Sequence, residues 1–117
     1  MKIVYASRTG NVASLIDKLG VEATRIDSGE EKIDEDFLLF TYTDGYGDIP
    51  VEVDSFLLEN HKHLKGVICS GDSSYGEAFC GAGDKIADIY SVPCLYKVEM
   101  DGSQEDVEKI QKIISEE

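Results

Sequence analysis

The N-terminal twenty residues constrain the fold most, because they pass from a strand pattern to a helix pattern across a short polar loop. Apolar side chains occupy positions 3–6 and then recur at positions 12, 15, 16 and 19, the spacing of one helix face. The loop at 7–11 reads Ser-Arg-Thr-Gly-Asn. In such a unit the loop amides and the first amides of the helix converge, and the helix dipole favours an anion there. The pattern predicts a phosphate cradle; an ordinary turn with Asn11 as helix N-cap is the alternative.

The loop lacks two glycine signatures of nucleotide-binding folds. A P-loop needs Gly-x-x-x-x-Gly-Lys-Ser/Thr, and a dinucleotide fold needs Gly-x-Gly-x-x-Gly at this position. Here Ser7, Thr9 and Asn11 offer side-chain donors, and Gly10 permits a positive φ. This hydroxyl-rich loop resembles the one with which flavodoxins hold the phosphate of flavin mononucleotide (FMN).

The remaining chain alternates between the two patterns. Strands are predicted at 2–6, 21–26, 37–42, 66–70 and 92–98. Helices are predicted at 11–19, from Pro50 onward, around 79–90 and after Ser103, whereas the polar segment between the second and third strands leaves little room for one. This alternation predicts a five-stranded parallel sheet covered by helices on both faces. The resemblance to flavodoxins implies a flavodoxin-like three-layer α/β sandwich with the strand order 2-1-3-4-5. In such sheets ligands bind at the carboxyl ends of the strands, near the reversal of strand order.

Apolar spacing also predicts the core. The helix around 79–90 should turn one stripe inward, made of Phe79, Ala82, Ile86, Ile89 and Tyr90. The three cysteines at 69, 80 and 94 have apolar neighbours and form no Cys-x-x-Cys pair. We expect them to be buried thiols that fill space, and we expect no metal site.

Length and charge exclude several classes of protein. The chain has 117 residues and a net charge of −13, from 24 acidic and 11 basic side chains. Such a charge repels nucleic acid and suits a partner with a basic surface. No apolar run approaches the roughly 20 residues of a membrane span, and the N-terminus enters a strand without a signal peptide. We therefore expect one domain over 1–117, acting as a monomer in the cytoplasm with no membrane partner.

Three loops should meet at the carboxyl edge of the sheet, namely 7–11, 43–49 and 70–76. Tyr46 lies between two glycines in the second loop, and Tyr75 lies beside Gly76 in the third. Two aromatic side chains on facing loops could hold a flat ring between them, next to the phosphate cradle. Three loops that suit one ligand favour FMN over an arrangement in which the tyrosines merely cover the core.

Nearly the whole chain resembles the NrdI family, the small flavodoxin-like proteins that serve class Ib ribonucleotide reductases. The resemblance is carried by 7–12, by 41–50 (Thr-Tyr-Thr-Asp-Gly-Tyr-Gly-Asp-Ile-Pro), and by Gly66-Val67, Ser70-Gly71, Gly76, Phe79, Tyr90, Val92-Pro93 and 102–108. Members of the family commonly have Ser-Gly-Asn-Arg-Asn-Trp-Gly at 70–76 and often Asn at 48. This chain has Ser-Gly-Asp-Ser-Ser-Tyr-Gly and Asp48 instead, which predicts more negative surroundings for a flavin.

The resemblance implies which residues bind FMN. Its phosphate would be held by Ser7, Arg8, Thr9, Gly10, Asn11 and Val12. Its ring would contact Thr43, Asp44, Gly45, Tyr46 and Gly47 from one loop, and Ser70, Gly71, Asp72, Tyr75, Gly76 and Phe79 from the other. Gly45 and Tyr46 would tune the flavin, since a carbonyl of this turn could rotate to accept a hydrogen bond from flavin N5.

The implied role is to pass an oxidant or electrons from FMN to the di-manganese, radical-bearing small subunit of the reductase, after reduction by an electron donor. Manganese would belong to that subunit, and no side chain of this chain would act as an acid, base or nucleophile. A general one-electron flavodoxin and a non-flavin interaction module remain alternatives. A receiver domain would need an acidic pair after the first strand, and a small phosphatase would need Cys-x₅-Arg; neither pattern is present.

Overall fold

Five parallel strands form the centre of the computed structural model, which describes residues 1–117. The strands are β1 (Lys2–Tyr5), β2 (Thr24–Arg25), β3 (Phe37–Thr41), β4 (Leu64–Gly71) and β5 (Cys94–Glu99). Their order is β2-β1-β3-β4-β5, which confirms the predicted topology. The order reverses between β1 and β3, so their carboxyl ends diverge where a ligand site is expected.

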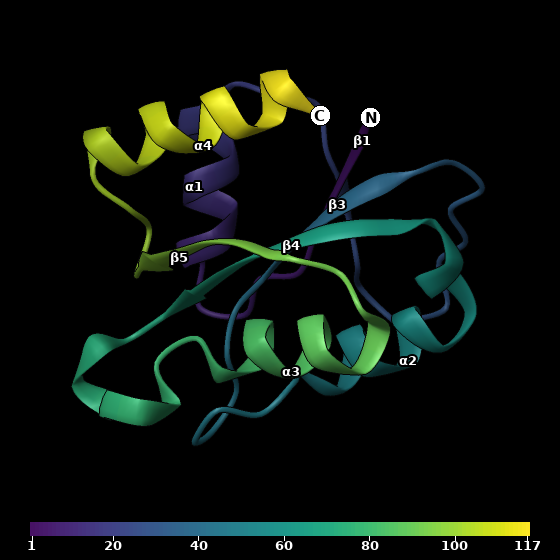
Figure 1. The fold of residues 1–117 in the computed structure, drawn as a ribbon, viewed down its shortest axis with the longest axis horizontal. Coiled ribbons are helices and arrows are strands. Elements are labelled where there is room, and N and C mark those ends of the chain that lie inside the picture. Colours follow the sequence, from purple (N-terminus) through teal and green to yellow (C-terminus); the bar gives the residue numbers. More distant parts are fainter.

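Helices cover both faces of the sheet (Figure 1). Helices α1 (Asn11–Leu19) and α4 (Gln104–Glu116) lie on one face, and α2 (Val51–Asn60) and α3 (Gly81–Tyr90) lie on the other. Two short 3-10 helices, η1 (His61–His63) and η2 (Ser73–Ala78), flank β4. No helix has both the length and the apolar character needed to cross a membrane.

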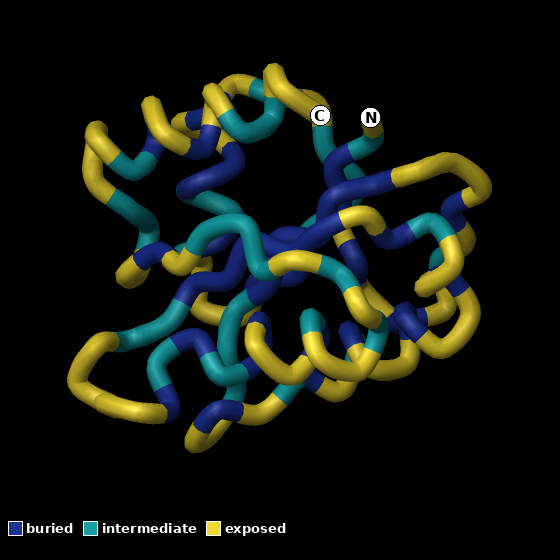
Figure 2. Tube along the Cα trace, in the orientation of Figure 1, coloured by how far each residue is buried: buried dark blue, intermediate teal, exposed yellow.

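Strand β3 is the centre of the core, and all five of its residues are buried (Figure 2). Side chains alternate across a strand. Accordingly, Phe37 and Leu39 pack with residues of α2 and α3, while Leu38 and Phe40 pack with residues of α1 and α4. The unbroken apolar run in the sequence therefore serves two cores, one on each face.

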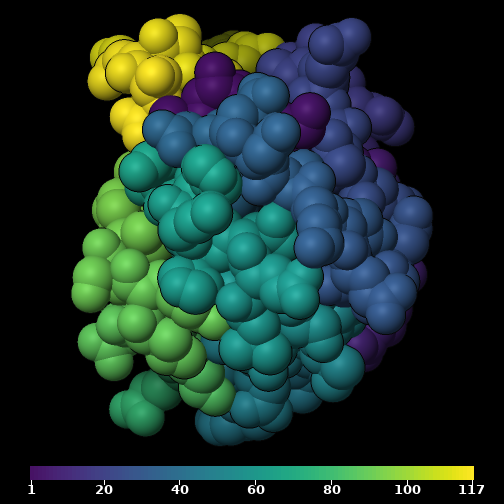
Figure 3. Space-filling model, turned by 90° about the vertical axis from the view of Figure 1, so that its right-hand side faces the viewer, coloured from purple at the N-terminus to yellow at the C-terminus, as the bar shows by residue number.

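The second predicted strand is much shorter than expected. Only Thr24 and Arg25 pair with β1, although the pattern suggested 21–26. The segment that follows contains no helix, as predicted, and it packs along the molecule beside α2 (Figure 3). The buried side chain of Asn60 holds it there by accepting from the Ile33 amide and donating to the Glu31 carbonyl, each at 2.8 Å.

The predicted inward stripe of the third long helix is partly wrong. Ile89 is 61% exposed, and Phe79 precedes α3 rather than belonging to it. The helix begins at Gly81, where a Cβ atom would lie 2.7 Å from Gly47 Cα. It approaches the sheet closely through Ala82, Gly83 and Ile86, so Ile89 falls at the side of the buried face.

The predicted bounds of α1 at 11–19, the start of α4 after Ser103 and the burial of two of the three cysteines are confirmed. Gly20 ends α1 in the left-handed conformation, and Ser103 and Asp106 form a capping box at the start of α4. Cys69 and Cys80 are fully buried, Cys94 is half-buried, and all three are free thiols. The N-cap of α1 is Gly10 with φ 98°, so Asn11 is the first residue of the helix rather than its cap.

Candidate functional site

A cavity of about 260 Å³ opens at the carboxyl edge of the sheet, at the end where β4 runs into η2 in Figure 1. Loops that follow β1, β3, β4 and β5 surround it. Its lining consists of Ser7, Arg8, Thr9, Asn11, Val12, Tyr42, Thr43, Gly45, Ser70, Gly71, Asp72, Tyr75, Ala78 and Met100. The three loops selected from the sequence therefore do meet in space.

The first loop presents a run of backbone amides that the protein itself does not satisfy. The Ser7 hydroxyl accepts the Ala13 amide at 3.2 Å, and the Gly10 carbonyl accepts the Ser14 amide at 2.9 Å. None of the amides at 8–12 donates to another group of the protein. Because they stand at the N-terminus of α1, where the helix dipole is positive, the loop can bind an anion.

The second loop is a tight turn with unpaired carbonyls at its tip. Asp44 and Asp48 exchange two backbone hydrogen bonds, of 2.9 and 2.7 Å, and enclose the tip between them. Gly45 has φ 48° and Gly47 has φ 92°, conformations that favour glycine. No carbonyl at 45–47 accepts a hydrogen bond within the protein, so the tip offers acceptors beside the cavity.

The two loop tyrosines lie against each other. Tyr46 and Tyr75 meet edge to face, with ring centroids 6.0 Å apart and an interplanar angle of 69°. They are 70% and 46% exposed. The sequence led us to expect facing rings with a slot between them. The structure has a closed pair instead, because the edge of one ring attracts the face of the other.

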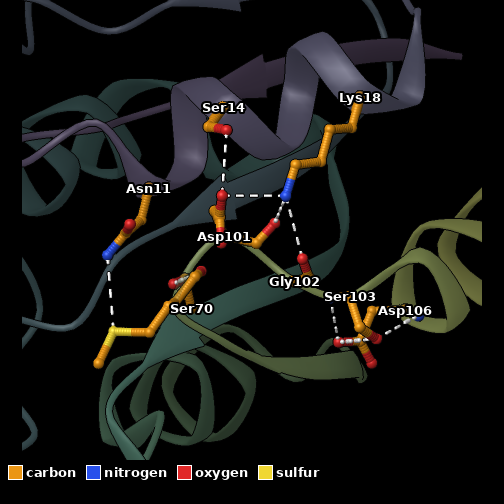
Figure 4. Close-up of polar contacts among 9 residues, drawn as sticks. Asn11, Ser14, Lys18, Ser70, Asp101, Gly102, Ser103 and Asp106 are labelled. Atoms are coloured by element: carbon orange, nitrogen blue, oxygen red, sulfur yellow. Dashed lines mark hydrogen bonds and ion pairs between the residues drawn. The ribbon is translucent and has the colours of Figure 1, made fainter.

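The loop after β5 contributes Met100, which sequence reasoning missed. The Ser70 hydroxyl donates to the Met100 carbonyl at 2.6 Å, and the Met100 amide donates to Gly71 at 2.9 Å. The side-chain amide nitrogen of Asn11 lies 3.8 Å from the Met100 sulfur (Figure 4). The rule that ligands bind at strand carboxyl ends applies equally to β5, so this loop could have been included. Tyr42 and Ala78 were also missed.

Figure 4 shows what holds this fourth loop against α1. The Lys18 ammonium donates to the Asp101 carboxylate at 2.9 Å and to the carbonyls of Asp101 and Gly102 at 3.2 and 3.0 Å. Ser14 also donates to the Asp101 carboxylate, at 3.3 Å. Hydrogen bonding to Lys18 holds the pKa of Asp101 below its usual range. This cluster fixes the wall of the cavity beside Met100.

Most negative charges near the cavity have partners. Arg8 donates two hydrogen bonds to Asp44, of 2.8 and 3.0 Å, and its guanidinium lies 5.0 Å above the Tyr42 ring. The bond to Arg8 lowers the pKa of Asp44, and the same pair raises the pKa of Arg8. Asp48 pairs with Lys85 on α3 at 3.1 Å. Of the two extra carboxylates, Asp48 is thus paired with a cation, whereas Asp72 lines the cavity without one.

Tyr42 connects this ion pair to α2. Its hydroxyl donates to the Glu52 carboxylate at 2.6 Å. Burial, and then the bond to Glu52, raises the pKa of Tyr42 to about 12. The phenol therefore stays protonated at neutral pH. Tyr42 can hold its position under Arg8 without adding a negative charge to the cavity.

The structure separates the predicted site residues into two groups. Those that do not line the cavity are Gly10, Asp44, Tyr46, Gly47, Gly76 and Phe79. Gly10 and Gly47 shape the backbone, and Asp44 holds Arg8. Phe79 packs on Cys69, Cys80 and Ala82 instead. The Asp72 carboxylate accepts the Ser74 amide at 2.9 Å, which caps the start of η2.

Comparison with known proteins gives one family. Residues 3–112 match the family described as "NrdI Flavodoxin like". The chain is 42% identical over 108 residues to the protein NrdI of Bacillus licheniformis, covering 92% of this chain and 82% of that protein. It is also similar in fold to a short-chain flavodoxin associated with a non-canonical PDU bacterial microcompartment, with a TM-score of 0.72 and 24% identity. That alignment covers 97% of this chain and 93% of the other. The chain belongs to the NrdI family of flavodoxin-like proteins.

Proposed function

We propose that this protein binds FMN in the cavity and acts as a redox partner of a class Ib ribonucleotide reductase. The observation that carries the proposal is the run of unsatisfied amides at 8–12, at the N-terminus of α1 in a flavodoxin-like fold. A phosphate monoester offers oxygens to several amides at once, and its charge complements the helix dipole.

The groups around the cavity suit the rest of FMN as well. The hydroxyls of Thr9 and Thr43 and the amide of Asn11 can bond to polar atoms of the ligand. A flat ring can enter between Tyr46 and Tyr75 once these side chains separate. Both are largely exposed, so their separation disturbs no core packing. Each ring face then gains an aromatic contact worth about 1 kcal/mol beyond the area it buries.

Bound FMN would supply the redox chemistry, and the protein would supply its binding and surroundings. The residues at 44–48 would set its environment. A carbonyl of the turn can accept a hydrogen bond from a protonated nitrogen at the ring edge. Arg8 and Lys85 reduce the negative potential of Asp44 and Asp48, which would otherwise oppose added electrons.

The finer role concerns the partner. We propose that the protein that receives oxidant from the flavin is the small, radical-bearing subunit of the reductase. Its di-manganese centre would use the oxidant produced at the reduced flavin. Membership of the NrdI family supports this role. Tyr46 and Tyr75 stand exposed at the mouth of the cavity, where a partner could cover them. The net charge of −13 favours a partner with a basic docking surface.

Titration of the purified protein with FMN, followed by absorbance and fluorescence, tests the cofactor. We expect shifted flavin bands and saturation at one FMN per chain. No change in the flavin spectrum would contradict the proposal. The partner is tested by measuring binding of this protein to the immobilised small subunit of a class Ib reductase. The small subunit of a different reductase class is the control. Equal binding to both subunits would favour a general electron carrier instead.

A further inference from the structure

The peptide between Ser7 and Arg8 begins the phosphate loop. Arg25 is the only residue outside the loop that donates a hydrogen bond to the carbonyl of this peptide. It lies on the edge strand β2, where it pairs in register with Tyr5 of β1. Its guanidinium donates to the Ser7 carbonyl at 2.8 Å and lies 5.7 Å from the centre of the Tyr5 ring. None of the signals in the sequence drew attention to this residue.

The contact between Arg25 and the Ser7 carbonyl also determines the direction of the Arg8 amide. A trans peptide is planar, so its C=O and N–H bonds point in opposite directions. The structure contains no cis peptide bond. With the Ser7 carbonyl directed at Arg25, the Arg8 amide must therefore point the opposite way. That amide has no acceptor in the protein, and Ser7 and Arg8 both line the cavity.

We propose that Arg25 is a positioning residue for phosphate recognition: it fixes the Ser7–Arg8 peptide so that the Arg8 amide faces the ligand. The proposal rests on the proposed binding of FMN and goes beyond it, because it assigns selectivity for the phosphorylated flavin to a residue outside the loop. A charged donor on the carbonyl also polarises the peptide, which makes its N–H a stronger donor.

The charges of the region support this assignment. Arg8, the other cation of the loop, is engaged by Asp44 through two hydrogen bonds. Arg25 has only a looser contact with Asp27, at 3.4 Å, and the Asp27 side chain is 78% exposed. Arg25 therefore brings to this loop a cation that is only loosely paired with a carboxylate.

Comparison of FMN with riboflavin tests the proposal, because the two ligands share the ring and differ by the phosphate. Dissociation constants are measured for the wild type, Arg25→Met and Arg25→Lys. The control is Lys109→Met, which removes the same charge from an exposed residue of α4 that pairs with Glu105 of the same helix and does not line the cavity. Urea unfolding of each variant reports on stability.

We expect Arg25→Met to weaken the binding of FMN about tenfold and that of riboflavin less than about twofold. This is the effect of losing one charge-assisted hydrogen bond that orients the peptide. Arg25→Lys keeps the charge without the planar fork and should weaken FMN about threefold. Lys109→Met should change neither constant. If Arg25→Met does not fold, Arg25→Lys carries the test with the same pair of ligands.

Four results overturn this proposal, and a fifth overturns the proposed function as well. Equal weakening of both flavins by Arg25→Met would mean that the residue only supports the fold. Full recovery of FMN affinity in Arg25→Lys, or an FMN loss in Lys109→Met as large as in Arg25→Met, would mean that charge alone matters. Unchanged FMN affinity in Arg25→Met would remove the role. A wild type that binds neither flavin would overturn the proposed function as well, which distinguishes the two failures.

Discussion

Two neighbouring loops of this protein gather backbone amides, and they differ in what satisfies them. After β2, the Glu31 carboxylate accepts the amides of Asp27, Ser28 and Gly29 at 2.8, 3.1 and 2.9 Å. After β1, the amides at 8–12 have no acceptor in the protein. The first loop carries its own anion, and the second is arranged to take one from outside.

The comparison shows how similar backbone features acquire different roles. Burial raises the pKa of Glu31, but hydrogen bonds from backbone amides lower it by more, so the net shift is downward. The charged carboxylate is thus part of the folded structure. At 7–12 the nearby side chains are hydroxyls, an amide and Arg8, and none supplies a negative charge. The chemistry of one side chain separates a structural loop from a binding loop.

The largest expected effect comes from giving the binding loop an anion of its own. In Thr9→Glu, a carboxylate beside the open amides should compete with and repel the FMN phosphate, lowering FMN affinity about a hundredfold. Riboflavin should bind as in the wild type. Thr9→Gln, of similar size and without charge, should lose only a few-fold. Equal losses in Thr9→Glu and Thr9→Gln would contradict this explanation.

The converse change removes the anion from the structural loop. Glu31→Gln should lower the free energy of unfolding by about 1–2 kcal/mol at neutral pH, because three amides lose a charged acceptor. The pKa of Glu31 is lower in the folded protein than its usual 4.5, so its contribution is complete above that pH and disappears as the pH falls through the folded pKa.

Chemical denaturation at several pH values measures this dependence. The difference between wild type and Glu31→Gln should shrink in acid. Glu30→Gln is the matched control, since the neighbouring Glu30 side chain is exposed and makes no hydrogen bond in the protein. A difference that persists at low pH, or an equal loss in Glu30→Gln, would show that the carboxylate charge is not the cause.

A smaller effect separates the shape of the binding loop from the stability of its helix. Gly10 and Gly20 flank α1, with φ of 98° and 68°. Alanine at either position should cost about 1 kcal/mol of stability, because a Cβ atom disfavours positive φ. Only Gly10→Ala should also weaken FMN binding, as measured by fluorescence titration. Comparable weakening in Gly20→Ala would assign the effect to helix stability.

The smallest effect concerns the acceptors opposite these amides. A Cβ atom at Gly45 would lie 3.2 Å from the Asp48 carboxylate, at a φ of 48°. Gly45→Ala should restrict rotation of the turn carbonyls and shift the one-electron potentials of bound FMN by a few tens of millivolts, given that a tenfold change in relative stability is about 59 mV. Spectroelectrochemistry measures this, with Gly20→Ala as control. Unchanged potentials would argue against tuning by this turn.

The fold could be predicted from the sequence because each element has a clear pattern. The apolar run of β3, the helix boundaries at Gly20 and Pro50, and the Ser103 cap place the elements along the chain. The strand order came from the resemblance to flavodoxins. The edges were less predictable. The pattern at 21–26 continues beyond the two residues that pair, since pairing at an edge depends on the neighbouring strand and not on apolar spacing.

The site could be predicted by loop but not by contact. The rule that ligands bind at the carboxyl ends of strands correctly predicted three of the four loops that line the cavity. The fourth loop, which contains Met100, was overlooked. Contacts between distant side chains have no local pattern. The Arg8–Asp44 pair spans 36 positions, and the bond from Arg25 to Ser7 joins an edge strand to a loop. Both became visible only in three dimensions.

Strand β2 joins the sheet through two residue pairs and one further hydrogen bond, from the Ile26 amide to Tyr5 at 2.8 Å. Amides there should exchange with solvent through local opening, at a free energy well below that of global unfolding. If anion binding at the 8–12 loop requires Arg25 in its place on β2, a bound anion stabilises the paired state of β2. The opening then becomes rarer as more of the sites are occupied. Hydrogen exchange at this edge would then report whether the cradle, one strand away, is filled.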